Sequence, residues 1–214
     1  MVRKAEQSER TRTALIDAAI RLFGERGYRA TPLKAIGEAA GISHGVIPFH
    51  FGSKEGLLLA VVERCFAVFT ESVLAPLGDG QHDYGMEDLH ALMRSQTRFG
   101  AEHPEAIRLF MVLMFEALGP SPELADHFRA FHARVHELGC AWVAQGIARG
   151  TVRADLDPDA VVDAILSFFT GARAHSLLLG PSAGRARVYE SMFEILRSAI
   201  EPPQEPRHAK GGKS

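Results

Sequence analysis

Residues 31 to 54, TPLKAIGEAAGISHGVIPFHFGSK, constrain the fold more than any other part of this chain, because three helix starts crowd into them. Thr31 is a good N-cap, and the proline after it suits the first helical position. Gly41 stands where a chain that leaves a helix needs a positive φ, and Ser43 can cap the helix that follows. Ser53 is a third cap candidate. The pattern predicts two short helices joined by a tight glycine turn, with another helix directly behind them, which is a helix-turn-helix arrangement.

Helical periodicity continues on both sides of this unit. Between residues 8 and 26, apolar residues recur at helical spacing until Gly27 ends the pattern. A further helix starts at Ser53 and runs toward Pro76. We find no strand-like alternation and no internal repeat. In the rest of the chain the pattern predicts helices over residues 86–102, from 104 to before 119, 121–149, from 157 past 177, and 185–200.

The predicted fold class is all-α, with a three-helix N-terminal helix-turn-helix domain over residues 1–52 and a larger helical domain over residues 53–200. Residues 201–214 are polar and rich in Pro and Gly, so we expect a disordered tail. Cys65 and Cys140 lie in helical, mostly apolar settings and are expected to be buried thiols. No apolar run approaches the roughly 20 residues that a membrane helix needs, so we expect no membrane contact.

The stretch from Ala18 to Leu58 resembles the N-terminal DNA-binding domain of the TetR family of bacterial transcriptional regulators. The matching residues are Ala18, Ala19, Leu22, Phe23, Gly27, Tyr28, Thr31, Ile36, Ala40, Gly41, Ser43, Gly45, Phe49, Phe51, Ser53, Lys54 and Leu57. The resemblance covers about the first quarter of the chain. It implies a homodimeric regulator, which we expect to be a repressor that a small, mainly apolar effector releases from a palindromic DNA operator.

Pro48 departs from the family pattern, which usually has a tyrosine that touches a DNA phosphate at this place. A proline at the fifth helical position after Ser43 removes the N–H that would bond the carbonyl of His44. We therefore expect a short or kinked recognition helix. The spacing of Phe49 suggests a core residue, which leaves His50 to face outward.

The distribution of charge suits a chain that meets phosphates at one end. Residues 1–54 hold nine Lys or Arg and five Asp or Glu, a difference of +4, whereas the rest hold fifteen and twenty-one, a difference of −6. A basic end on an acidic body favours DNA contact at that end only. The basic residues Arg3, Lys4, Arg10 and Arg12 either add backbone contacts or form a solvated tail.

The first turn after Ser43 is the part of a recognition helix that reaches base edges. His44 can donate to guanine or accept from the adenine amino group, and Val46 can pack against a thymine methyl. Hydroxyl and ammonium groups at helix starts can bind phosphates, although simple capping also explains Thr31 and Ser43. The predicted DNA-binding residues are Thr31, Lys34, Ser43, His44, Gly45, Val46, Phe49, His50 and Lys54.

The resemblance also implies an effector pocket and a dimer interface in the C-terminal domain. The candidate pocket residues are Phe99, His103, Phe110, Met111, Met114, Phe115, Trp142 and Phe169, with ordinary helix-bundle core as the alternative for each. The candidate interface residues are Ile165, Phe168, Ala172, Ser176, Met192, Phe193 and Leu196. Arg173 either pairs with an acidic residue or faces the pocket.

Other functional classes have weaker support. The G-x-S-x-G pattern at residues 41–45 lacks the preceding strand of a hydrolase nucleophile elbow, so we expect no enzyme. His132 and His136 lie four apart, with His127 a turn earlier, but neither a cysteine cluster nor an HExxH pattern accompanies them. We expect a solvated helix face there, and neither a metal site nor a cofactor.

A DNA-binding protein without an effector is the remaining alternative. The charged start of the chain predicts no signal peptide and a cytoplasmic protein.

Overall fold

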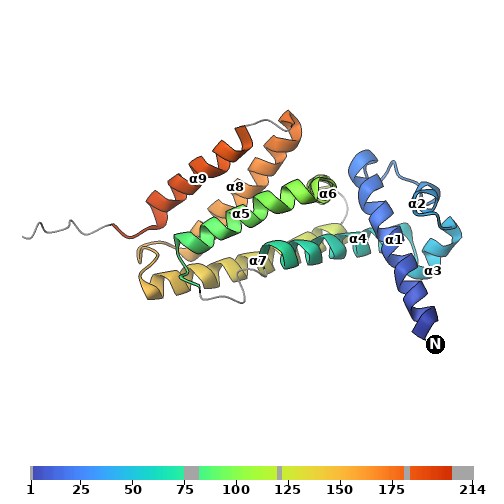
Figure 1. Cartoon of the computed structure of the whole chain (residues 1–214), viewed down its shortest axis with the longest axis horizontal. Helices are drawn as coiled ribbons and strands as arrows, with labels where there is room; N and C mark the ends of the chain where they lie inside the picture. Colours follow the sequence, from blue (N-terminus) through green and yellow to red (C-terminus); the bar gives the residue numbers. More distant parts are fainter. Residues whose placement is uncertain (1, 75–81, 120–121, 181–183, 204–214) are drawn as a thin grey trace, which may run out of the picture.

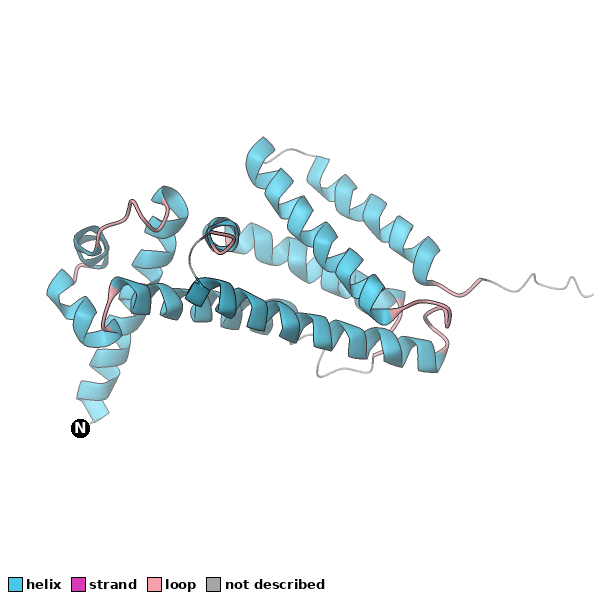
Figure 2. Ribbon diagram, turned by 180° about the vertical axis from the view of Figure 1, so that it is seen from behind, coloured by secondary structure: helices cyan, strands magenta, loops and turns pink. Residues whose placement is uncertain are grey.

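In the computed structural model, which describes residues 2–74, 82–119, 122–180 and 184–203, every regular element is a helix (Figure 1) (Figure 2). The predicted all-α fold class is therefore confirmed. The α-helices are α1 (Val2–Arg26), α2 (Leu33–Ala40), α3 (Ile47–Phe51), α4 (Lys54–Phe69), α5 (Met86–Glu102), α6 (Pro104–Glu116), α7 (Pro122–Arg149), α8 (Pro158–Leu179) and α9 (Gly184–Ile200). A 3₁₀ turn, η1 (His44–Val46), precedes α3, and a π-helical turn, η2 (Thr70–Leu74), extends α4. Most of the predicted tail lies outside the described residues.

Two parts are visible in the ribbon (Figure 1). Residues 2–53, which we call the head, form a compact group of α1, α2, η1 and α3 at one end. Residues 54–200, which we call the body, form an elongated bundle, and α4 runs from the head into it. None of the helices in the described residues is long and apolar enough to cross a membrane.

Local capping explains where several of these helices begin and end. The Ser53 hydroxyl accepts a hydrogen bond from the amide of Gly56 at 3.1 Å, and the Asp157 carboxylate accepts one from Asp159 at 3.1 Å. Gly41 ends α2 with φ at 67°, which lets the Ile42 amide reach the Gly37 carbonyl at 2.9 Å. The predicted helix starts at Ser53 and Asp157 and the predicted helix end at Gly41 are confirmed.

Thr31 is the exception among the predicted caps. Helix α2 begins at Leu33 with Pro32 in the cap position, and the Thr31 side chain is fully buried. Its hydroxyl donates to the Gly27 carbonyl at 2.8 Å, with the Leu22 carbonyl 3.2 Å away. The predictions that Thr31 caps a helix and binds DNA are wrong, because this hydroxyl is used to fasten the chain to the end of α1.

One apolar core joins the head to the body. It contains Phe23 and Ile36 from the head, Leu57 from α4, and Leu109 and Leu113 from α6, all with almost no exposed surface. Helices α1 and α6 approach closely at Gly24, where a Cβ would lie 3.3 Å from the Glu105 carbonyl oxygen. Head and body are therefore packed against each other through side chains, and are not connected only by a flexible linker.

Aromatic side chains fill the next layer of the body. The ring of Phe66 on α4 stacks on Phe131 of α7 at 4.0 Å between centroids, and it meets Phe110 and Phe128 edge-on. A second core, farther from the head, is built from α5, α7, α8 and α9 around Met93, Val143 and Phe169. Together, these two cores draw side chains from all six helices of the body, α4 to α9, and hold them in fixed positions.

Candidate DNA-binding surface and ligand cavity

The segment after the glycine turn is short and broken, as Pro48 predicts. Residues 44–46 form the 3₁₀ turn η1, in which the Ile47 amide bonds the His44 carbonyl. Pro48 follows as the second residue of α3, where it has no N–H to give to a longer helix. Helix α3 then ends after one turn, with the Gly52 amide bonded to the Pro48 carbonyl at 2.9 Å.

The first turn of this segment presents its side chains to solvent. Ser43, His44 and Gly45 are exposed, and Val46 is half-buried. Ser43 occupies the cap position but its hydroxyl makes no capping hydrogen bond, so the predicted capping role is wrong. The hydroxyl is instead open to a partner outside the protein.

Phe49 lies on the surface, with 83% of its area exposed, so the prediction that it belongs to the core is wrong. The buried residue of this segment is Ile47. A 3₁₀ turn advances about 120° per residue instead of 100°, which changes the phase of the side chains that follow it. His50 is half-buried and its ring meets the Phe49 ring edge-on at 5.2 Å. The exposed phenyl ring of Phe49 enlarges the surface that this segment can offer to DNA.

Helix α2 holds the exposed turn in place through Gly37, a residue that sequence reasoning missed. A Cβ at this position would lie 2.7 Å from the Ile42 carbonyl oxygen and 2.8 Å from the His44 amide nitrogen. Gly37 is buried, and its carbonyl accepts the Ile42 amide hydrogen bond. The backbone of α2 therefore touches the backbone of the turn directly, with no side chain between them.

Lysine side chains border the same surface in two different ways. Lys34 is 73% exposed and lies 3.9 Å from Glu38, a separation typical of a weak surface ion pair. Lys54 donates to the Tyr28 carbonyl at 2.7 Å and lies 4.4 Å from the centre of the Tyr28 ring. Burial lowers the pKa of Lys54. Lys54 thus ties α4 to the end of α1, and two of its three ammonium protons remain for another acceptor.

A cavity of about 320 Å³ lies between α5, α7 and α8 in the body. Its lining is mainly apolar: Tyr84, Asp88, Leu89, Leu92, Val135, Leu138, Gly139, Ala141, Trp142, Val143, Gln145, Val162, Ile165 and Leu166. This volume and composition are typical of small-molecule sites. Of the eight predicted pocket residues, Trp142 lines this cavity and the other seven do not.

The seven other predicted pocket residues lie elsewhere in the body. Phe115 has 56% of its surface exposed, and its predicted role in a pocket stays a prediction. Phe110 belongs to the aromatic layer around Phe66, which is the core alternative. Phe99, Met111 and Phe169 are buried. The centre of the His103 ring lies 5.0 Å from the centre of the Phe99 ring. Met114 packs partly buried against the core that joins head and body.

Asp88 is the charged residue of the cavity. Burial alone would raise its pKa, but hydrogen bonds from His82 and from the Tyr84 amide hold the pKa of this carboxyl below its usual value. The carboxylate oxygens lie 3.0 Å from the His82 ring and 2.9 Å from the Tyr84 nitrogen. The Asp88 carboxylate is therefore ionised near neutral pH and marks a polar end of the cavity.

Arg173 points into the body from α8. Its guanidinium donates to the Gln96 amide oxygen and lies 5.4 Å from the centre of the Phe69 ring. Burial lowers the pKa of Arg173. Within the described parts of the chain no ion pair to Arg173 is found, so the structure favours neither a carboxylate partner nor the 320 Å³ cavity, which Arg173 does not line.

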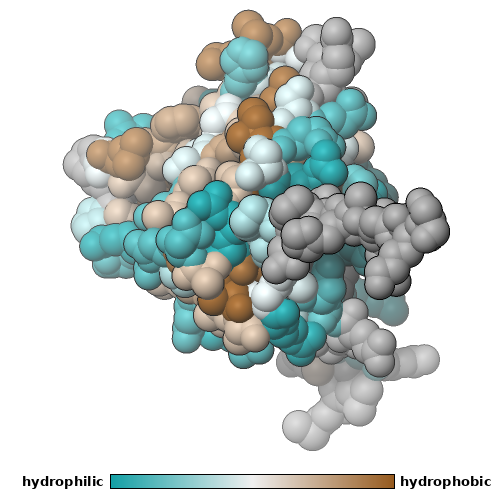
Figure 3. All heavy atoms as spheres, turned by 90° about the vertical axis from the view of Figure 1, so that its left-hand side faces the viewer, coloured by the Kyte–Doolittle hydropathy of each residue, from teal (hydrophilic) through white to brown (hydrophobic). Residues whose placement is uncertain are grey.

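The predicted dimer residues on α8 and α9 are mostly half-buried. Ile165 is 8% exposed and lines the cavity, and its predicted place in a dimer interface stays a prediction. Phe168, Met192, Phe193 and Leu196 pack partly against the second core, and Ala172 and Ser176 are half-buried. Exposed large apolar residues missed by sequence reasoning lie on the same two helices: Leu178, Leu179, Val188 and Ile195. Viewed from the end of the body, apolar patches interrupt the hydrophilic surface (Figure 3).

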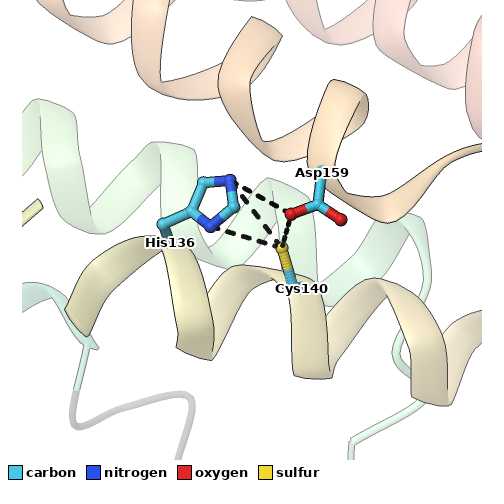
Figure 4. A group of neighbouring side chains, drawn as sticks. All are labelled: His136, Cys140 and Asp159. Atoms are coloured by element: carbon cyan, nitrogen blue, oxygen red, sulfur yellow. Dashed lines mark hydrogen bonds and ion pairs between the residues drawn. The ribbon is translucent and has the colours of Figure 1, made fainter. Parts of the chain in front are cut away.

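A cluster of potential metal ligands joins α7 to the start of α8 (Figure 4). His136, Cys140 and Asp159 each offer one ligand atom, and these atoms lie within 4.8 Å of one another. The solvated face predicted for His132 and His136 is wrong, because both are half-buried. Cys140, predicted to be buried, is also half-buried.

Comparisons with known proteins match both parts of the chain. The family described as "Bacterial regulatory proteins, tetR family" matches residues 15–61, and "Tetracyclin repressor-like, C-terminal domain" matches residues 86–199. The HTH-type transcriptional regulator UidR of Escherichia coli (strain K12) is 29% identical over 159 residues, which cover 72% of each chain.

Solved structures show the same fold. A TetR transcriptional regulator from Chloroflexus aurantiacus J-10-FL superposes with a TM-score of 0.80 at 24% identity, over 92% of this chain and 98% of that one. AibR in complex with isovaleryl coenzyme A and operator DNA superposes with a TM-score of 0.69 at 20% identity, over 88% of this chain and 99% of that one. The two matched families together account for the head and the body.

Proposed function

Since this chain belongs to the TetR family and is a DNA-binding transcriptional regulator, we propose that it is a homodimeric repressor that a small, mainly apolar effector releases from a palindromic operator. The exposed turn from Ser43 to Val46 is the observation that carries the DNA-binding part. Its side chains are free of internal hydrogen bonds in the described structure, and the backbone of α2 fixes its position. A rigid turn with open donors is what base readout needs.

Thr31 is left out of the proposed contact surface, because its hydroxyl is buried. The proposed residues that read or approach bases are His44, Gly45, Val46 and Phe49. Those proposed to contact phosphates are Lys34, Ser43, His50 and Lys54.

The apolar residues that α8 and α9 leave on the surface support the proposed dimer. Leu178 and Leu179 end α8 with 83% and 67% of their areas exposed, and Ile195 on α9 is 59% exposed. Large exposed apolar side chains in a group mark interaction surfaces. Two copies joined through α8 and α9 would place two reading turns on one face of DNA, about 34–36 Å apart or a multiple of that spacing.

The body is proposed to bind the effector in the cavity beside Trp142. Its apolar lining suits an apolar ligand, and the Asp88 carboxylate offers an acceptor or a negative charge at one end. The structure of AibR contains both isovaleryl coenzyme A and operator DNA, which supports a combination of ligand and DNA binding here. The two heads of the dimer can adopt different distances from each other. A ligand that binds more tightly to the conformation with a mismatched distance shifts the population of dimers away from the conformation that fits DNA.

DNA binding is tested with duplexes from the region upstream of the gene. We expect specific and salt-sensitive binding, and a loss of at least tenfold in affinity for His44→Ala, since one good base contact contributes about 1–3 kcal/mol. His127→Ala, on α7 and outside both the reading turn and the proposed dimer helices, is the matched control and should bind as the unmodified protein does. Equal affinity of both variants would contradict the assignment of the reading turn.

The effector proposal is tested against the alternative of a DNA-binding protein without an effector. Ligands that raise the melting temperature are selected first, because binding to the folded state alone stabilises it. A selected ligand should weaken operator binding in the unmodified protein and lose its effect in Leu92→Trp, which fills the cavity from α5. If Leu92→Trp binds DNA normally and still responds fully to the ligand, the cavity is not the effector site.

A further inference from the structure

A cluster of mixed ligand types lies outside the DNA surface and the effector cavity. His136 and Cys140 occupy successive turns of the same side of α7, and Asp159 and Asp163 do the same on α8. The two helices bring these side chains together although 19 residues separate Cys140 from Asp159 (Figure 4). Imidazole, thiol and carboxylate together are the donor set that zinc takes in proteins.

The separations between the ligand atoms fit one metal ion. A tetrahedral zinc with ordinary bond lengths requires ligand atoms about 3.6 Å apart for nitrogen–sulfur and sulfur–oxygen pairs, and about 3.4 Å apart for nitrogen–oxygen pairs. The Cys140 sulfur lies 3.9 Å from Nε2 of His136 and 3.7 Å from Oδ1 of Asp159. The same Nε2 lies 3.7 Å from the Asp159 oxygen. The sulfur also lies 3.6 Å from Nδ1 of the same ring. The separations through Nε2 exceed the tetrahedral values by at most about 0.3 Å, so a small adjustment lets the three atoms serve as three corners of a coordination tetrahedron.

Asp163 lies next to the fourth corner. Its Oδ1 is 3.3 Å from Nε2 of His136, so it can bind the ion directly or accept a hydrogen bond from a water that does. A groove of about 620 Å³ adjoins this corner and is lined by His132, His136, Asp163, Ser167 and neighbouring residues of α7 and α8. The groove gives an ion a path to the ligands from solvent.

The charge around the cluster favours a cation. Asp157, Asp159 and Asp163 all lie near the Cys140 thiol. The summed negative charge of three carboxylates exceeds the partial positive charge, about one half of an elementary charge, at the start of a helix such as α8. The like-charged carboxylates Asp159 and Asp163, one helical turn apart, repel each other, and a cation between them relieves the repulsion.

We propose that His136, Cys140 and Asp159 bind a divalent zinc-class metal ion, with Asp163 beside the fourth coordination position. The Cys140 thiol gives up its proton to solvent as the sulfur–metal bond forms, and no electron is transferred. The bound ion would fasten the start of α8 to the middle of α7. The proposal is independent of effector binding, because none of these four residues lines the 320 Å³ cavity.

The test uses the full chain without an affinity tag, treated with chelator and then titrated with zinc chloride by calorimetry. We expect one zinc per chain and at least a hundredfold loss of affinity in Cys140→Ser, His136→Gln and Asp159→Asn, since even the loss of supporting residues costs 10–100-fold at metal sites. His127→Gln, on the same helix but outside the cluster, should bind zinc as the unmodified protein does. Magnesium and calcium chloride should not compete, because these ions prefer oxygen ligands.

Two further readouts separate this site from zinc held elsewhere. Cobalt chloride should give a thiolate-to-metal absorption band that is absent from Cys140→Ser, and zinc should protect Cys140 from alkylation, as read by peptide mass spectrometry. Circular dichroism confirms that each variant is folded. Zinc binding of equal affinity in all three ligand variants, or no binding at micromolar zinc, would overturn the proposal. Either result leaves the proposed DNA binding untouched, because DNA is not part of the measurement.

Discussion

Gly37→Ala is the sharpest test of how the head positions its reading turn. The added methyl would lie 2.7, 2.8 and 2.9 Å from the Ile42 oxygen, the His44 nitrogen and the His44 Cα. Ordinary contacts at such atoms are about 3.5 Å, so the turn must move by roughly 0.5–0.8 Å. All three neighbours are backbone atoms, and no side-chain rotation can relieve the overlap.

The expected energies follow from two opposing effects. Overpacking of a well-packed site costs about 1–3 kcal/mol, whereas alanine is favoured over glycine inside a helix by about 0.5–1 kcal/mol. The free energy of unfolding should therefore fall by about 0–2.5 kcal/mol, and the protein stays folded. A displaced His44 loses base contacts in both heads of a dimer. At tenfold for each 1.4 kcal/mol, the loss of about one such contact in each head lowers operator affinity by roughly a hundredfold.

Fluorescence anisotropy on the operator and on a scrambled duplex measures this effect, with urea unfolding in parallel. Binding to the scrambled duplex depends on phosphates and should change less than about threefold. Gly100→Ala is the matched control, because beyond the backbone of its own helical turns no atom lies within 4 Å of its added methyl; it should keep operator affinity and gain about 0.5–1 kcal/mol in stability. Operator affinity of Gly37→Ala within twofold of the unmodified protein would refute the reasoning that α2 fixes the reading turn.

Three other substitutions or treatments give clear expectations. Thr31→Val removes the buried hydroxyl that bonds the Gly27 carbonyl, so urea unfolding should show a loss of about 1–3 kcal/mol while the folded variant keeps its operator affinity. A selective loss of DNA binding would return Thr31 to the contact surface. Phe49→Ala should change stability by less than about 0.5 kcal/mol, because the ring is 83% exposed, yet weaken operator binding in anisotropy titrations; unchanged affinity would exclude the ring from the interface. Burial raises the pKa of Cys65 to about 12, so on the order of one thiol in ten thousand is ionised at pH 8 and iodoacetamide should leave Cys65 unmodified until urea unfolds the protein. Rapid labelling of Cys65 in the folded state would contradict its burial.

The helices themselves could be predicted from the sequence because their signals are local. Ser53, Gly41 and Asp157 each act within a few residues, and their hydrogen bonds lie where the pattern places them. The capping prediction for Thr31 was wrong because a threonine before a helix looks the same in the sequence whether its hydroxyl caps that helix or donates to a carbonyl of another helix. The core prediction for Phe49 was wrong because it assumed α-helical spacing from Ser43 onward. Pro48 favours a 3₁₀ turn before it, and the larger angle per residue in that turn places Ile47, rather than Phe49, in the core.

The ligand sites were less predictable because they depend on how helices cross. The cavity beside Trp142 is formed by α5, α7 and α8, and no periodicity in one helix reveals the space between three. His136 and Cys140 share a helix, but Asp159 comes to them from the next one. The spacing of His136 and Cys140 was visible in the sequence, and it is the signal that would have found the metal ligands.

The shared core across the predicted boundary at residue 52 determines which segment can be exchanged between regulators. A head cut after residue 52 would leave Leu22 and Phe23 without Leu57 and Leu109, and would open the approach of α1 to α6 at Gly24. A transferable DNA-reading cassette must therefore include α4 and carry a matching face of α6 with it. In this chain, altered operator specificity is best grafted residue by residue onto the turn after Ser43, while the packing beneath it is left intact.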